Sequence, residues 1–201
     1  MKLNDLLFQN CMNRIELFDE SLFRWINGHH CTMLDWTMWT FSQSWSWLIV
    51  ILLVYIFITL RTDRKNWMWI LLGVALCFLL ADQISNNALK DGVQRLRPCY
   101  QLPDVRMFRT GKGGLYGFPS SHAANAFSVA MFLSLAYGRK HKTLAWILFS
   151  WATVVAYSRP YLGKHYPADI LCGALLGLGI GAAVYFVISR IRARTSSRRS
   201  A

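Results

Sequence analysis

Residues 166–189 have the sequence YPADILCGALLGLGIGAAVYFVIS, an apolar run in which Asp169 is the one charged residue. A helix needs about 20 mostly apolar residues to cross the hydrocarbon layer of a bilayer, so this run predicts a transmembrane helix. Gly173, Gly177 and Gly181 follow at four-residue steps and place small residues on one face of that helix. We interpret this face as a packing contact with another helix of the same chain, in preference to a dimerisation surface.

The rest of the chain repeats this pattern of apolar runs separated by short charged loops. Four further runs are candidates to cross a bilayer, at about 41–60, 67–87, 121–138 and 143–158. Residues 3–27 mix large apolar side chains with acids and amides, which is typical of an amphipathic helix on a membrane surface. The sequence therefore predicts an all-α, polytopic membrane bundle of about five transmembrane helices. We expect an N-terminal interfacial segment at 1–40, a transmembrane domain at 41–189 and a disordered basic tail at 190–201.

The chain has a formal net charge of +12, which is also typical of nucleic-acid-binding proteins. We favour the membrane interpretation, because the predicted spans leave no soluble domain for a nucleic acid and basic residues commonly flank membrane spans. The basic residues lie on both predicted faces in equal number, so their count does not orient the bundle. The loops at 61–65 and 139–142 and the basic tail are cytoplasmic if several basic residues of the other face bind anions.

Three short motifs combine basic, hydroxyl, imidazole and carboxylate side chains. They are Lys90-x6-Arg97-Pro98, Pro119-Ser120-Ser121-His122 and Ser158-Arg159-x5-His165-x3-Asp169. The first two share one loop, and two predicted crossings separate the second from the third. An even number of crossings returns the chain to the same side of the membrane. The topology therefore predicts that all three motifs meet at one membrane surface.

The basic residues of these motifs predict an anion site. Arg97 and Arg159 offer planar guanidinium groups that match phosphate oxygens, and Lys90 adds a compact positive charge. Ser120 and Ser121 open an apolar helix, whose first backbone amides and dipole also favour an anion. Each residue alone also fits a structural role as a membrane-interface anchor or a helix cap. The prediction rests on their occurrence together at one face.

His165 and Asp169 add a nucleophile to this site. They are four residues apart and hence on one face of a helix, where the carboxylate can orient the imidazole. His122 is placed to give a proton to a departing oxygen. A histidine and an aspartate at this spacing are more often a surface pair, and only the neighbouring cations favour catalysis here. The sequence thus predicts phosphoryl transfer through a histidine nucleophile.

The three-part motif across residues 90–169 resembles the type 2 phosphatidic acid phosphatases, whose wider superfamily includes acid phosphatases, vanadium haloperoxidases and glucose-6-phosphatase. The resemblance implies a phosphohistidine on His165, a ring held by Asp169 and a leaving group protonated by His122. It also implies hydrolysis without a metal or another cofactor. The residues implied to bind phosphoryl oxygens are Lys90, Arg97, Ser120, Ser121 and Arg159. Ser121 departs from the family's usual glycine, which keeps a backbone amide but loses glycine's conformational freedom.

Asp82, Asn86 and Lys90 also follow one another at four-residue steps. Polar residues within a membrane helix usually face the interior of the bundle. We expect these residues to form either a chain that supports Lys90 or a purely structural polar contact.

A phosphatase site at the membrane surface favours a substrate whose tail stays in the bilayer. Four further cations of the same loop exceed the needs of one phosphate monoester, namely Arg95, Arg106, Arg109 and Lys112. We therefore expect an envelope lipid processed at the extracytoplasmic face of a bacterial inner membrane, with a slight preference for lipid A. Undecaprenyl diphosphate, phosphatidylglycerol phosphate and phosphatidic acid are alternatives. A small membrane transporter is the alternative from another class.

Overall fold

The computed structural model describes residues 3–61, 67–138 and 141–199, and every regular element within these ranges is a helix. The elements are α1 (Leu3–Gly28), α2 (Thr32–Ser42), α3 (Ser44–Arg61), α4 (Trp67–Gln83), the π-helical segment η2 (Ile84–Lys90), α5 (Asp91–Val93), α6 (Pro98–Gln101), α7 (Ser121–Tyr137), α8 (Lys142–Tyr161) and α9 (Pro167–Arg199). The predicted all-α class is confirmed.

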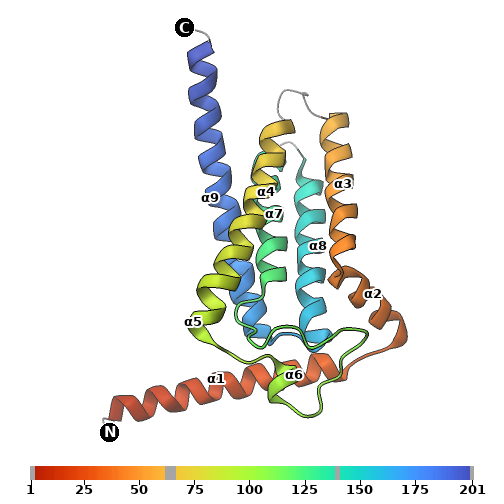
Figure 1. Cartoon of the computed structure of the whole chain (residues 1–201), viewed down its shortest axis with the longest axis vertical. Coiled ribbons are helices and arrows are strands. Elements are labelled where there is room, and N and C mark those ends of the chain that lie inside the picture. Colours follow the sequence, from red (N-terminus) through yellow and green to blue (C-terminus); the bar gives the residue numbers. More distant parts are fainter. Residues whose placement is uncertain (1–2, 62–66, 139–140, 200–201) are drawn as a thin grey trace.

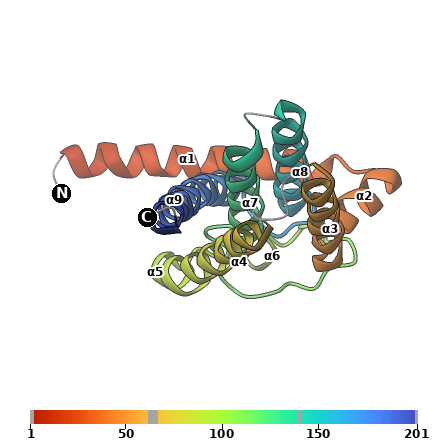
Figure 2. The same ribbon diagram turned by 90° about the horizontal axis from the view of Figure 1, so that it is seen from above.

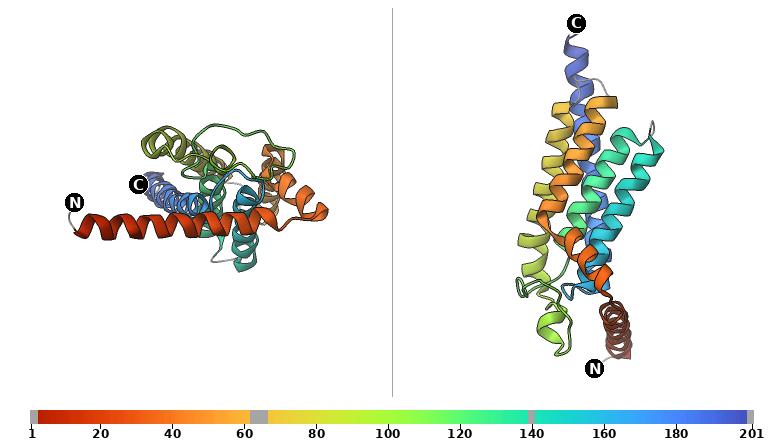
Figure 3. Two further views of the ribbon diagram at one scale, coloured as in Figure 1. Left: turned by 90° about the horizontal axis from the view of Figure 1, so that it is seen from below. Right: turned by 90° about the vertical axis from the view of Figure 1, so that its right-hand side faces the viewer.

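Five long helices, α3, α4, α7, α8 and α9, run alongside one another to form a bundle (Figure 1). Seen from above, they appear nearly end-on while α1 lies across them (Figure 2). The loop between α5 and α7 and the turn between α8 and α9 lie at the same end of the bundle as α1, and the C-terminus lies at the other end (Figures 1 and 3). The fold thus brings the three motifs to one end, as the count of crossings predicts.

Two helical stretches, Trp67–Val93 and Pro167–Thr195, are long and apolar enough to cross a membrane, with mean hydropathies of 1.9 and 2.2. The first stretch combines α4, η2 and α5, and the second is most of α9. Length and hydropathy thus support two of the expected crossings. The total of five spans stays a prediction for the other three helices.

Helices α7 and α9 form the closest contact of the bundle, and the glycine stripe of α9 makes this contact possible. A Cβ atom on any of the three glycines would come within 3.0 Å of a backbone carbonyl oxygen of α7 or its cap. The pairs are Gly173 with Ser120, Gly177 with Ala124, and Gly181 with Ser128. Because small residues let helix backbones approach in lipid, the stripe is an intramolecular packing surface, as expected.

Helix α1 confirms the helix expected at residues 3–27. Its inner face buries Asp19, Phe23 and Ile26 against the bundle, whereas Phe18 and Trp25 are exposed. Exposed aromatic side chains on a helix across the bundle's end fit a position at the membrane surface. That position stays a prediction.

Some boundaries differ from those expected. The predicted span at 41–60 is divided between α2 and α3, and α8 continues past Pro160 to Tyr161. Helix α9 continues to Arg199, through most of the tail for which the sequence predicts disorder. The tail contains no glycine or proline that would end the helix. Residues 62–66 and 139–140, which hold part of the basic loops assigned to the cytoplasm, lie outside the described residues.

Candidate active site

A tight turn between α8 and α9 delivers His165. Gly163 has φ +76°, a left-handed conformation that favours glycine, and a Cβ atom there would lie 2.6 Å from Val105 Cγ1. The amide of Lys164 then donates to the carbonyl of Arg159 at 2.9 Å. The turn thereby holds the last residues of α8 close to the nucleophile and to the first turn of α9.

His165 and Asp169 lie side by side as expected, but His165 belongs to the turn before α9, which begins at Pro167, so the turn and not a shared helical face brings them together. The His165 Nδ1 atom is 3.5 Å from Asp169 Oδ2, and both side chains are buried, with exposed fractions of 2% and 0%. Oδ2 also accepts a hydrogen bond from the Tyr166 amide at 3.0 Å, and Oδ1 accepts one from Arg95 Nη1 at 2.8 Å. Distances between catalytic groups, such as that from His165 Nδ1 to Asp169 Oδ2, are commonly long before a substrate binds. The carboxylate is therefore held in place to orient the ring.

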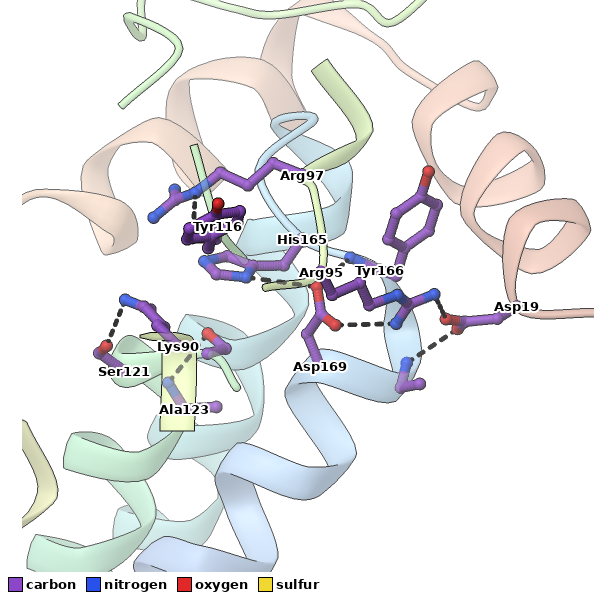
Figure 4. Close-up of polar contacts among 12 residues, drawn as sticks. Asp19, Lys90, Arg95, Arg97, Tyr116, Ser121, Ala123, His165, Tyr166 and Asp169 are labelled. Carbon is purple, nitrogen blue, oxygen red and sulfur yellow. Dashed lines mark hydrogen bonds and ion pairs between the residues drawn. The ribbon is translucent and has the colours of Figure 1, made fainter. Parts of the chain in front are cut away.

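The surroundings keep the His165 ring neutral. Burial is the main cause that lowers the pKa of His165 well below its usual value, and the charges of Arg159 and Arg97 act in the same direction. A neutral imidazole has a free lone pair, which a nucleophile needs. Figure 4 shows the ring between Asp169 on one side and the side chains of Arg97 and Lys90 on the other. With Nδ1 turned to Asp169, Nε2 is the nitrogen available to an anion held by these cations.

The site contains three buried cations that form no ion pair in the described part of the chain. Arg97, Arg159 and Lys164 have exposed fractions of 9%, 6% and 7%. Arg97 Nε donates to the carbonyl of Tyr116 at 3.1 Å, and Arg159 Nη1 donates to Ser42 Oγ. Arg159 Nε is buried without a hydrogen-bond partner, and no ion pair joins any of the three to a carboxylate in the described part of the chain. Buried charge of this kind is costly unless an anion compensates it.

Lys90 is the fourth cation of the site. A series of side-chain hydrogen bonds holds it in place, which is one of the two alternatives that the sequence allows. Its Nζ atom donates to Asn86 Oδ1 at 2.5 Å and to Ser121 Oγ at 2.9 Å. Asn86 Nδ2 donates in turn to Asp82 Oδ1 at 2.7 Å, so the four-residue steps form a supporting chain. The hydroxyl that distinguishes Ser121 from the family's glycine therefore binds the lysine. It also donates to Asn86 Oδ1 at 2.9 Å.

Ser120 and His122 lie at the start of α7. Ser120 is the N-cap, its hydroxyl accepts from the Ala123 amide at 3.4 Å, and its own amide donates to the Asp169 carbonyl at 2.9 Å. The ring of His122 lies 5.9 Å from that of Trp47 in an edge-on arrangement. His122 is also within electrostatic range of Arg159 and His165. The structure thus brings every predicted site residue to one end of the bundle.

The four extra cations of the loop contact protein groups. Each has a protein partner, which gives its charge a role in the loop without a highly charged head group. Arg95 pairs with Asp19 and Asp169, Arg106 pairs with Asp35, Arg109 stacks on Trp36 and Trp39, and Lys112 stacks on Tyr100. The loop uses these charges to fold over the end of the bundle.

Comparison with known proteins identifies the family. The model of the PAP2 superfamily matches residues 69–193. The chain belongs to the PAP2 superfamily. It is a phosphatase, hence a hydrolase, and a membrane protein whose substrate is a lipid phosphate, as the sequence predicts.

Two relatives of this PAP2 chain are named lipid A 4'-phosphatases. The one from Porphyromonas gingivalis is 33% identical over 88% of this chain and 75% of its own length, and the one from Bacteroides thetaiotaomicron is 34% identical over 89% and 80%. The crystal structure of Aquifex aeolicus LpxE superposes with a TM-score of 0.60 at 27% identity, covering 82% of this chain and 92% of that one. A phosphatidylglycerolphosphate phosphatase from Bacillus subtilis shares the fold, with a TM-score of 0.65 at 21% identity over 90% and 88%.

Two residues of this PAP2 site escaped the sequence reasoning. Lys164 directly precedes the nucleophile, so a search for cations next to His165 would have found it. Asp19 lies on α1, far away in sequence, and reaches the site through Arg95 and the Ala168 amide. Sequence spacing carries no signal for such a contact.

Proposed function

We propose that this PAP2 phosphatase removes a phosphate group from lipid A at the extracytoplasmic face of a bacterial inner membrane. The observation that carries the reaction is a buried histidine beside buried cations that form no ion pair with a carboxylate in the described residues, and burial lowers the pKa of this histidine. Such a site is complementary to a phosphoryl group, whose charge the cations would compensate. The preference for lipid A rests on the two relatives of that name, which match most of the chain.

The proposed reaction has two steps. His165 Nε2 attacks phosphorus, the bond to the lipid oxygen breaks, and His122 gives that oxygen a proton. Water then attacks the phosphohistidine, returns a proton to His122 and releases inorganic phosphate, which restores the free ring of His165. Asp169 would orient the ring throughout. The residues proposed to hold the phosphoryl oxygens are Lys90, Arg97, Arg159 and Lys164, with the hydroxyl of Ser120 and the amide of Ser121.

The proposed orientation follows the charges at the far end of the bundle. Arg190, Arg192 and Arg194 lie on the last part of α9, after the apolar run at 166–189 and towards the C-terminus, at the end opposite the site (Figure 1). Basic residues next to a membrane span favour the cytoplasmic side. This would place the active site and α1 on the extracytoplasmic side.

A comparison of substrates tests the function. Full-length protein in detergent, with a metal chelator present, is supplied with lipid A, undecaprenyl diphosphate or phosphatidylglycerol phosphate, and released phosphate is measured. We expect the highest kcat/KM for lipid A, and the 4'-phosphate is the first position to assay by mass spectrometry. If one of the other lipids has a higher kcat/KM, that lipid and not lipid A is the preferred substrate. Failure with all three would reject the proposed reaction with these lipids.

Replacing Lys164 tests whether the missed cation belongs to the phosphate site. Burial, with the charges of Arg159 and Arg97, lowers the pKa of Lys164 to about 8, so its charged form destabilises the free protein at pH 7. Lys164→Met should raise the thermal midpoint at pH 7 while raising KM for the lipid phosphate about 10-fold, the scale of one hydrogen bond to a charged group. Because a depressed lysine pKa makes the wild type more stable as pH rises above 8, the gain should shrink there.

Lys112→Met is the matched control for this experiment. Its ammonium group stacks on Tyr100, with Nζ 5.3 Å from the ring centroid. Removal of that charge should leave KM unchanged. A Lys164→Met variant with a lowered thermal midpoint and an unchanged KM would show that Lys164 has only a structural role.

A further inference from the structure

A chain of charged contacts connects the nucleophile to helix α1. Asp169, which faces His165, accepts a hydrogen bond from Arg95 Nη1 at 2.8 Å. The other guanidinium nitrogen, Nη2, donates to Asp19 Oδ2 at 2.6 Å. Figure 4 shows this row from His165 through Asp169 and Arg95 to Asp19. Neither Arg95 nor Asp19 is one of the defined positions of the three motifs.

Arg95 is fixed in a single orientation by its surroundings. Its guanidinium carbon lies 4.3 Å from the centroid of the Tyr166 ring, against which it stacks. The Tyr166 hydroxyl donates to Gln101 Oε1 at 3.0 Å, so the ring is itself held. Because both ends of the fork bind carboxylates, Arg95 is engaged within the protein and is not a free phosphate ligand.

Asp19 joins α1 to the start of α9. Its Oδ1 atom accepts a hydrogen bond from the Ala168 amide at 2.8 Å, one residue before Asp169. Phe23, one turn further along α1, packs against Tyr166 with ring centroids 5.4 Å apart. The exposed fraction of Asp19 is 5%, so one buried carboxylate of α1 fixes both Arg95 and the first turn of α9.

The charge of Arg95 links this arrangement to the reaction, because it stabilises the carboxylate of Asp169. Asp169 is completely buried, and a buried carboxylate is costly unless it is paired and hydrogen-bonded. Arg95 supplies the compensating charge by binding Oδ1. Oδ2, which accepts from the Tyr166 amide, then faces His165, whose ring gains positive charge as phosphorus bonds to it. We propose that Arg95 and Asp19 are positioning residues that hold Asp169 against the nucleophile, so that α1 is part of the catalytic structure. The proposal rests on the proposed function of His165.

Three substitutions test these roles. Arg95→Gln removes the charge, Arg95→Lys keeps the charge but cannot bridge two carboxylates, and Asp19→Asn removes the charge from α1 while preserving its shape. With a lipid phosphate substrate, we expect Arg95→Gln to lower kcat about 10- to 100-fold, the scale of one hydrogen bond to a charged group. Arg95→Lys should recover part of that loss, and Asp19→Asn should lower kcat less than Arg95→Gln does. KM should stay within about threefold, because substrate contacts are intact.

The ion pair between Arg24 and Asp104 provides a matched control. It also joins α1 to the loop, with Arg24 Nη1 2.7 Å from Asp104 Oδ2, but it does not touch Asp169. Arg24→Gln should leave kcat unchanged. If it lowered kcat as far as Arg95→Gln does, the effect would come from general docking of α1, and the proposal would be overturned.

Other outcomes are equally decisive. A rise in KM without a fall in kcat would mean that Arg95 binds the substrate, which contradicts a positioning role. If Arg95→Gln does not fold, Arg95→Lys and Asp19→Asn carry the test, and unchanged kcat in both would reject the proposal. A wild-type protein without phosphatase activity would instead reject the proposed function. These two failures are therefore distinguishable.

Discussion

Replacing His165 with asparagine is expected to lower phosphate release about 1,000-fold or more, because loss of a nucleophile that works with other groups removes most of the catalysis. The ring is buried and neutral, and Nε2 faces the cations because Nδ1 faces Asp169. Asparagine preserves the size of the buried group but supplies no nucleophilic nitrogen. Phosphate release from lipid A and acid-quenched trapping of phosphohistidine measure the effect. The variant should bind its substrate and yield no phosphoenzyme.

A change of leaving group distinguishes the proposed roles of the two histidines of the site. His122 would protonate the departing oxygen, and a phenolic leaving group of low pKa needs little protonation. His122→Asn should therefore regain much of its activity on an activated aryl phosphate, whereas His165→Asn should stay inactive on it. His29→Asn, which alters an exposed histidine bound to the Trp25 carbonyl, serves as the control. Substantial turnover of lipid A by His165→Asn would exclude the histidine mechanism.

The sequence predicts the residues of the active site better than the residues that hold them in place. This is because helix periodicity and the parity of membrane crossings can be deduced from spacing. Two crossings must return the third motif to the side of the first. The contact of Lys90 with Asn86 follows the same periodicity along η2. By contrast, the bond from Lys90 to Ser121 joins two helices, and their register has no signature in the sequence.

The roles of the loop cations could not be deduced from composition. Arg106 and Lys112 count equally as positive charges, yet one forms an ion pair with Asp35 and the other stacks on Tyr100. Such partners depend on how the loop folds over α1 and α2, which is a matter of long-range packing. Lys164 directly precedes His165 in the sequence, but the phosphate-binding role proposed for it rests on its burial and its lack of an acidic partner in the described structure.

Replacing Arg159 with methionine is the second change with a large expected effect. Arg159 is 6% exposed, its side chain donates only to Ser42, and its Nε atom has no partner in the described structure. A group held in this way fits a phosphoryl oxygen, whose charge must be stabilised in the transition state. Loss of one such donor typically lowers turnover about 100- to 1,000-fold, and we expect a fall of that size in kcat/KM.

The stability of the Arg159 variants separates a ligand from a structural residue. Methionine fills similar space without a buried, uncompensated charge, so Arg159→Met should match or exceed the thermal midpoint of the wild type even as activity falls. Arg159→Lys keeps the charge but loses the planar fork and should retain an intermediate activity. Ser42→Ala, which removes only the protein partner of Arg159, should change kcat/KM little. Should Arg159→Met unfold while Arg159→Lys remains fully active, the guanidinium would serve the fold rather than the phosphate.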